Sequence, residues 1–62
     1  MFEEHNPYHV IAVDSGGVVK HTMALPTKFL AKGRERVWKD EFPNLHIRVE
    51  YIYGNTTLYL VQ

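Results

Sequence analysis

The sequence IRVEYIYGNTTLYLVQ, residues 47–62, closes the chain and predicts two strands joined by a tight turn. Residues of high β propensity stand on both sides of Gly54-Asn55, and glycine at the first turn position suits a two-residue type II′ turn. The hydrophobic pairs that this turn creates are Tyr51 with Leu58 and Val49 with Leu60. We therefore expect this face of the hairpin, which also holds Ile47, to belong to the hydrophobic core.

The opposite face of the same hairpin is also apolar. The strands therefore offer more apolar area than the one helix of so short a chain can cover. In the predicted register it carries Arg48, Glu50, Ile52, Thr57, Tyr59 and Val61. Tyrosine suits interfaces because its ring gives apolar area and its hydroxyl can meet a partner. The last strand has neither charge nor proline, which favours pairing with another chain. We predict a protein-binding site at Ile52, Tyr59 and Val61, with Arg48 and Glu50 at its rim.

A helix precedes this hairpin. Leu25-Pro26-Thr27 favours a helix start, since proline suits the first turn and threonine can cap it. The helix is expected to end near Glu41, before Pro43. On a helical wheel, the arc expected to face the sheet holds Phe29, Leu30, Gly33, Val37 and Trp38. Glycine inside a helix costs roughly 1 kcal/mol relative to alanine, so we expect the helix backbone to approach the sheet closely at Gly33.

Two further strands open the chain. Residues 8–14 are rich in β-branched and aromatic side chains, and residues 18–24 return after Asp14-Ser15-Gly16-Gly17, whose residue types favour a turn. The register stays open between two groupings. A three-residue loop places on one face Ile11, Val13, Val19 and Met23. A two- or four-residue loop places on one face Tyr8, Val10, Ala12, Val19 and Met23.

These elements predict one α+β domain over residues 1–62. Residues 1–7 form an extended arm, because Asn6-Pro7 disfavours helix. The order is strand, strand, helix, strand, strand, and a right-handed crossover through the helix places the third strand beside the first. We expect a four-stranded antiparallel sheet in the order 2-1-3-4, with the helix on one face.

Size and composition narrow the functional classes. The chain has 62 residues, no cysteine and a formal net charge of zero. Disulfides and thiolate sites are therefore excluded, and bulk attraction to nucleic acid or membranes is not implied. A domain this small is marginally stable and often gains stability by oligomerising or binding. The acidic start lacks a signal-peptide pattern, and no apolar run approaches the roughly 20 residues of a membrane span. We expect a soluble, cytoplasmic protein.

The residue types that carry catalysis or metal binding are scattered. The histidines stand at positions 5, 9, 21 and 46 and have no cysteine partner. Pro7 prevents a helix that would align His5 with His9, and His9 and His21 could lie on neighbouring strands, but solvent-facing strand histidines are the better interpretation. Ser15 lies in a glycine-rich turn, and a hairpin offers no pocket that could hold a nucleophile with its base. We predict that the protein is not an enzyme and binds no metal or cofactor.

The outer face of the predicted helix is basic. It carries Lys28, Lys32, Arg36 and Lys39, with Arg34 at its edge. Such a stripe can contact phosphates, so nucleic-acid binding through these four residues is an alternative function. Glu35 lies within the stripe, and pairing between residues four positions apart on a solvated face is the simpler interpretation.

The layout of hairpin, amphipathic helix and closing hairpin with a GN turn covers most of the chain. It resembles small phage-encoded inhibitors of bacterial proteins, among them anti-CRISPR proteins, RNA polymerase inhibitors and uracil-DNA glycosylase inhibitors. The resemblance implies a non-catalytic viral protein that blocks a larger host enzyme or defence complex by its surface. A homodimer or a structural subunit of an oligomeric assembly is a further alternative.

Residues 25–60 are also similar to DinI-like modulators of RecA. The similarity rests on Phe42-Pro43-Asn44, which follows the helix, and on Ile47-Arg48-Val49 in the next strand. DinI-like proteins end in a second, acidic helix that engages RecA, whereas this sequence closes with a strand. Its first hairpin also stands where that family has a single opening strand.

Overall fold

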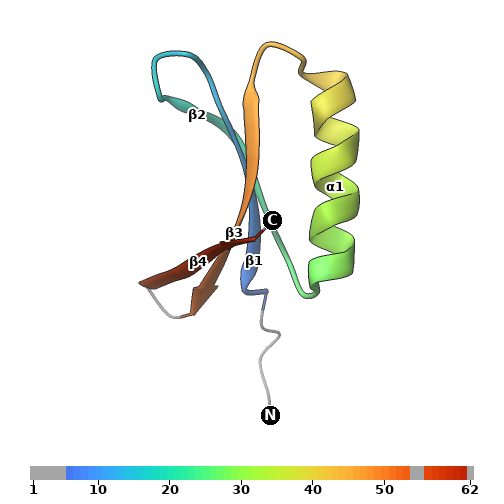
Figure 1. Cartoon of the computed structure of the whole chain (residues 1–62), viewed down its shortest axis with the longest axis vertical. Coiled ribbons are helices and arrows are strands. Elements are labelled where there is room, and N and C mark those ends of the chain that lie inside the picture. Colours follow the sequence, from blue (N-terminus) through green and yellow to red (C-terminus); the bar gives the residue numbers. More distant parts are fainter. Residues whose placement is uncertain (1–5, 54–55, 62) are drawn as a thin grey trace.

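The computed structural model describes residues 6–53 and 56–61, except for the side chains of Thr56, Thr57 and Tyr59. The elements in chain order are β1 (Tyr8–Val13), β2 (Val19–Leu25), α1 (Lys28–Glu41), β3 (His46–Tyr53) and β4 (Thr56–Val61). The strands form one antiparallel sheet in the order β2-β1-β3-β4, and α1 packs on one of its faces (Figure 1). The predicted α+β fold and strand order are confirmed.

A tight loop joins β1 to β2. The amide of Gly17 donates to the carbonyl of Asp14, and the amide of Asp14 donates to the carbonyl of Val18, both at 3.0 Å. Gly17 has a φ of +85°, a conformation that glycine adopts without strain. The Asp14 carboxylate accepts from the amides of Gly16 and Val18, at 2.9 Å each. The bond from Val18, more than any other contact, holds the pKa of Asp14 below its ordinary value.

A bulge decides the register of this first hairpin. Val10 pairs with Met23, but the register shifts after Ala12, so that Val13 pairs with Val19. Val10 and Ala12 are buried in the core and Met23 packs against it, as the second of the two predicted groupings requires. Val19 is the exception at 53% exposed, because the bulge removes it from the alternation of β2.

The helix begins and ends where the sequence predicts. Thr27 is its N-cap residue, and the Thr27 side-chain oxygen accepts a hydrogen bond from the amide of Leu30 at 3.2 Å. At the other end, the amide of Phe42 donates to the carbonyl of Trp38 at 2.7 Å. Pro43 follows and cannot continue the helix.

α1 packs on the sheet through a narrow face. Its buried residues are Ala31, Glu35 and Trp38, which are three or four positions apart and so share one side. The small side chain of the fully buried Ala31 lets the helix backbone approach the strands. Trp38 makes an edge contact with the ring of Phe42, and His21 stacks on Phe42 with 4.4 Å between ring centroids. This aromatic cluster joins the end of α1 to β2.

The prediction of which helix residues face the sheet is wrong for four of the five. Only Trp38 faces the strands. Phe29 and Gly33 are two positions before and after Ala31, a rotation of about 200° that carries them to the opposite side. A Cβ at Gly33 would meet no atom within 4 Å, so Gly33 does not approach the sheet. The exposed fractions of the other three are 84% for Phe29, 46% for Leu30 and 48% for Val37.

The predicted register of the last hairpin holds beside the turn, where Tyr53 pairs with Thr56 and Ile52 with Thr57. Farther along it is wrong by one residue, because the observed pairs are Tyr51 with Tyr59, Glu50 with Leu60 and Val49 with Val61. The register shift in this ladder leaves Leu58 as an extra residue of β4. The alternation of apolar residues in the sequence does not reveal such a bulge. Val61 therefore lies in the core at 6% exposed, while Leu58 and Leu60 are 55% and 51% exposed.

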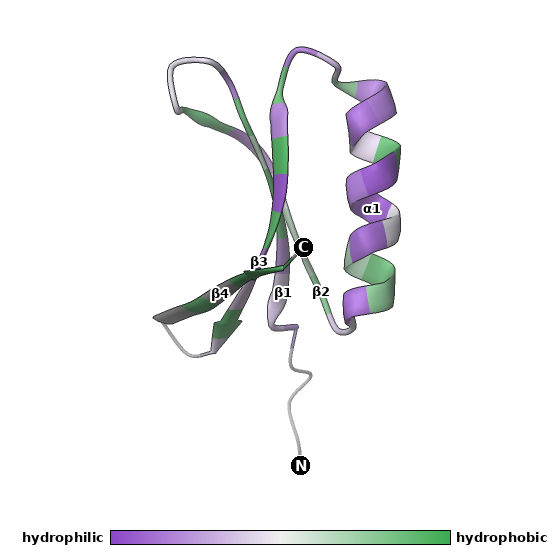
Figure 2. Cartoon of the chain, in the orientation of Figure 1, coloured by the Kyte–Doolittle hydropathy of each residue, from purple (hydrophilic) through white to green (hydrophobic). Residues whose placement is uncertain are grey.

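The core lies between α1 and the sheet. Its fully buried residues are Val10, Ala12, Ala31 and Val49. Apolar segments follow the strands in Figure 2, whereas much of α1 is hydrophilic. The carbonyl of Pro7 accepts the amide of Ile52 at 2.8 Å, so Pro7, directly before β1, lies beside β3. Residues 1–5 of the predicted arm lie outside the described residues.

Candidate functional site

The face of β3 and β4 that points away from α1 is the first candidate site. We call it the hairpin surface and define it by Arg48, Glu50, Ile52, Leu58 and Leu60. The Nε of Arg48 donates to Oε2 of Glu50 at 2.7 Å, and these side chains are 36% and 19% exposed. Glu50 is the ladder partner of Leu60. A partly buried ion pair therefore adjoins leucines that are more than half exposed.

The structure brings together three of the five predicted binding residues. Arg48, Glu50 and Ile52 alternate along β3 and share the face away from α1. Val61 does not lie there, because it is packed in the core. The side chain of Tyr59 lies outside the described residues, so its part in binding stays a prediction.

Leu58 and Leu60 are the surface residues that sequence reasoning missed. It assigned both to the core, since a two-residue turn followed by an unbroken ladder would have placed them opposite Tyr51 and Val49. A signal was nevertheless present in TTLYLV, which has apolar residues at consecutive positions. Whichever register holds, one apolar set of this strand must remain on the face away from the helix.

The two edge strands of the sheet differ in charge. β2 carries Lys20 and His21, and the Nζ of Lys20 lies 3.8 Å from Oδ2 of Asp14. β4 has no charged residue. Charge on an edge strand opposes pairing with a second strand, whereas an uncharged, apolar edge favours it. β4 is therefore the edge at which an additional strand would pair.

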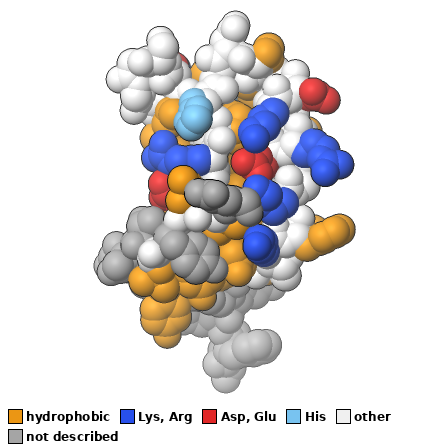
Figure 3. All heavy atoms as spheres, viewed as in Figure 1, with side chains coloured by type: hydrophobic (Ala, Val, Ile, Leu, Met, Phe, Trp, Pro, Cys, Tyr) orange, Lys and Arg blue, Asp and Glu red, His pale blue; other side chains and the backbone are white. Residues whose placement is uncertain are grey.

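One flank of α1 is basic. It carries the predicted nucleic-acid-binding residues Lys28, Lys32, Arg36 and Lys39. Glu35 lies among them, with its carboxylate oxygens 2.6 Å from Nζ of Lys32 and 3.4 Å from Nζ of Lys39. Burial raises the pKa of Glu35, but the hydrogen bonds and charges of the two lysines outweigh it and hold the pKa below its ordinary value. Figure 3 shows Lys and Arg side chains around acidic ones on this side of the molecule.

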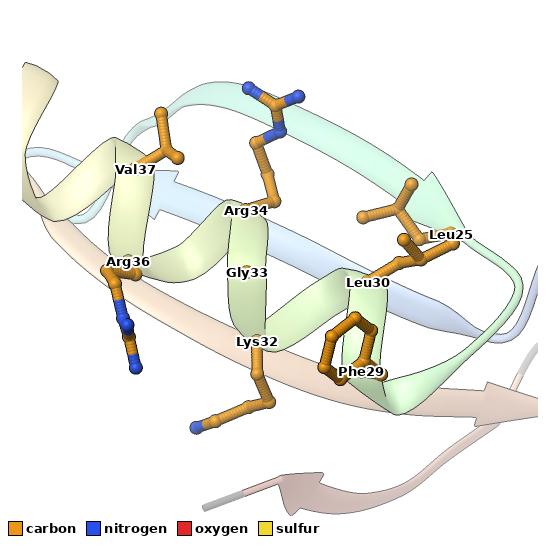
Figure 4. A pocket seen from close by; sticks show the side chains of 8 residues that line it. All are labelled: Leu25, Phe29, Leu30, Lys32, Gly33, Arg34, Arg36 and Val37. Atoms are coloured by element: carbon orange, nitrogen blue, oxygen red, sulfur yellow. The ribbon is translucent and has the colours of Figure 1, made fainter.

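The second candidate site lies on the outer side of α1. We call it the helix groove, an open depression of about 620 Å³. Its apolar residues are Leu25, Phe29, Leu30, Gly33 and Val37, and its cationic residues are Lys32, Arg34 and Arg36. In Figure 4 the side chains of Leu25, Leu30 and Phe29 gather at one end, Val37 lies at the other end, and Gly33 is between them. The groove therefore contains Phe29, Leu30, Gly33 and Val37, the four residues that were wrongly predicted to face the sheet.

The described residues include no group of three or more His, Cys, Asp or Glu side chains that could hold a metal ion. His21 belongs to the aromatic cluster with Trp38 and Phe42. Within the part of the chain that the structure describes, no helix has the length and apolar character needed to cross a membrane.

Comparison of the chain with protein-family models, with curated proteins and with solved structures gives no match. We therefore infer function from the hairpin surface, the basic flank and the helix groove.

Proposed function

We propose that this protein is a non-catalytic binding module that attaches to a larger protein through the hairpin surface and the free edge of β4. The observation that carries the proposal is the exposure of Leu58 and Leu60, at 55% and 51%, on an edge strand without charge. Single exposed apolar side chains are common on proteins, whereas adjoining ones mark interaction surfaces.

A partner strand beside β4 would supply hydrogen bonds to the outward-facing backbone groups of this edge. In this mode of binding, backbone hydrogen bonds provide affinity and pockets for alternate side chains provide specificity. Leu58 and Leu60 are two positions apart and so suit such pockets. The Arg48–Glu50 ion pair would lie at the margin, where charges orient a partner more than they strengthen its binding.

The role that fits such an attachment is inhibition or modulation of a bacterial enzyme or defence complex in the host cytoplasm. It is supported by the resemblance of the sequence layout to that of phage-encoded inhibitors, in which a small domain acts through its surface. A second copy of the chain is the alternative occupant of the same edge, and would give a homodimer.

Nucleic-acid binding through the basic flank is the second candidate. It is supported by the gathering of four cationic side chains along one side of α1. Glu35 pairs with Lys32 and Lys39, so a phosphate would have to compete with an internal carboxylate for those two lysines. Titration of labelled single- and double-stranded DNA at two salt concentrations tests this candidate. Binding that weakens steeply with salt and disappears in Lys28→Glu with Arg36→Glu would support it.

Affinity capture from bacterial lysate tests the first proposal. The wild type is compared with a Leu58→Ser, Leu60→Ser double variant, and captured proteins are identified by mass spectrometry. The matched control is Val18→Ser with Val19→Ser, which removes side chains of similar exposure, 56% and 53%, from the first hairpin. Sedimentation of the same three proteins shows whether a second copy is the occupant.

We expect the wild type and the control to retain the same partner and the leucine variant to lose it, with circular dichroism spectra unchanged. Retention of the same proteins by all three, together with identical sedimentation, would contradict the proposal.

A further inference from the structure

The helix groove is a second interaction surface, and we propose that it receives an acidic, amphipathic helix of a partner protein. The groove lies on α1, whereas the hairpin surface is formed by β3 and β4. The groove is therefore separate from the hairpin surface, although it shares Lys32 and Arg36 with the basic flank.

The apolar part of the groove is a line along the helix. Phe29, Gly33 and Val37 are four positions apart, so they follow one another on a single side of α1. From Phe29 to Val37 this line is about 12 Å long, at 1.5 Å per residue. Phe29 is 84% exposed and Val37 is 48% exposed. Leu30 and Leu25 extend the apolar area toward the end of β2 (Figure 4).

Gly33 opens a gap in the middle of this line. A Cβ at this position would meet no atom within 4 Å, so the space above the Gly33 backbone is empty. Phe29 on one side and Val37 on the other stand above it. Helices pack by fitting the side-chain ridges of one into the depressions of another. A ridge of apolar side chains on a partner helix fits the depression at Gly33.

The charge at the margins of the groove identifies the partner as acidic. Arg34 and Arg36 line it together with Lys32. Among the described residues, the helix cations in ion pairs are Lys32 and Lys39, both with Glu35. Arg34 and Arg36 thus have no carboxylate partner within that part of the chain. Carboxylates on the flanks of a docked helix would complement them, which speeds association and fixes orientation.

Two other occupants match the groove less well. A second copy presenting its own groove would bring its arginines against these arginines, and like charges in an interface are costly. A nucleic acid could place phosphates at the cationic margins, but its polar backbone would leave the apolar centre at Phe29 and Leu30 unmatched. An apolar ridge with acidic flanks matches both the centre and the margins of the groove.

Fluorescence anisotropy with designed peptides tests the inference. The probe is a labelled peptide of about 18 residues, long enough to hold a helix, with leucines on one face and glutamates on its flanks. A second peptide carries lysines in place of the glutamates. Gly33→Leu fills the gap, Arg34→Glu reverses a marginal charge, and Lys28→Glu makes the same charge change outside the groove. Gly33→Leu is not expected to unfold the protein, since leucine favours helix and the site is open.

We expect the glutamate peptide to bind and the lysine peptide not to bind. Gly33→Leu and Arg34→Glu should each weaken binding by about tenfold, as loss of a central contact does, while Lys28→Glu should change it by less than about twofold. The Leu58→Ser, Leu60→Ser variant should bind the peptide as the wild type does, which separates this inference from the proposed function.

Three results would overturn the inference. One is equal binding of the glutamate peptide to the wild type and to Gly33→Leu, or no binding to the wild type at low salt. Another is binding of a single-stranded oligonucleotide that Gly33→Leu abolishes, which would assign the groove to nucleic acid. The third is self-association in sedimentation that Gly33→Leu abolishes, which would make a second copy the occupant.

Discussion

Val49 and Val61 face each other across the β3–β4 ladder within the core, where they are 0% and 6% exposed. Because successive side chains of a strand point to opposite faces, this pair places Leu60 on the face away from α1. One pairing in the last strand thus decides which residues stabilise the fold and which remain available to a partner.

Substitutions at the neighbouring positions 60 and 61 should have very unequal effects on stability. Val61→Ala removes two methyl groups from the core and should lower the free energy of unfolding by about 1–2.5 kcal/mol. Leu60→Ala changes an exposed side chain and should alter it by less than about 0.5 kcal/mol. Urea denaturation followed by circular dichroism measures both. A larger loss in Leu60→Ala than in Val61→Ala would favour a β3–β4 ladder without the bulge at Leu58.

Gly33→Ala should stabilise the protein. An alanine side chain at this position meets no atom within 4 Å, and alanine is favoured over glycine inside a helix by about 1 kcal/mol. The melting temperature should therefore rise by a few degrees, about 4–8 °C for each kcal/mol in a domain of this size. Gly17→Ala is the control and should lower it, since Gly17 has a φ of +85°. Destabilisation by Gly33→Ala would show that Gly33 is closely packed after all.

Stability should fall in acid because of Glu35. Lys32 and Lys39 outweigh the effect of burial and hold the pKa of this carboxyl below its ordinary value of 4.5. A group whose pKa is lowered by folding stabilises the protein above that ordinary value, and the contribution is lost as the pH falls through the folded pKa. We expect the free energy of unfolding to decline as the pH drops below about 4.5.

Glu35→Gln provides the comparison. It should lower the free energy of unfolding at neutral pH by about 1–2 kcal/mol, because bonds to charged groups are lost. It should also flatten the acid profile. Asp14 has a lowered pKa and acts in the same direction, so Asp14→Asn with Glu35→Gln should flatten the profile further. An unchanged acid profile in Glu35→Gln would show that its lysine contacts do not stabilise the fold.

The parts of the fold that were predictable depend on local signals. Pro26, Thr27 and Pro43 mark the helix ends through capping and backbone geometry, which act within a few residues. The strand order follows from the handedness of the crossover, and it holds without knowledge of any side-chain contact.

The faces of α1 and β4 could not be predicted, because apolar residues on both sides of each element make two packings plausible. The outward side of α1 has three large apolar residues, Phe29, Leu30 and Val37, and the buried side has only Trp38. Even so, the small Ala31 and the aromatic cluster around Trp38 decide which side meets the strands. In β4, a single extra residue at Leu58 exchanges the inner and outer sets. The predicted binding site therefore kept Arg48, Glu50 and Ile52 but required Leu58 and Leu60 in place of Val61.

The unequal charge of the two sheet edges limits how large a homo-oligomer can grow by strand pairing. Two copies could join β4 to β4 in a two-fold arrangement, which leaves both Lys20-bearing strands at the outside. A filament would need a second edge open to strand pairing on every molecule, and Lys20 opposes such pairing at β2. Polymerisation through the sheet would thus stop at two molecules.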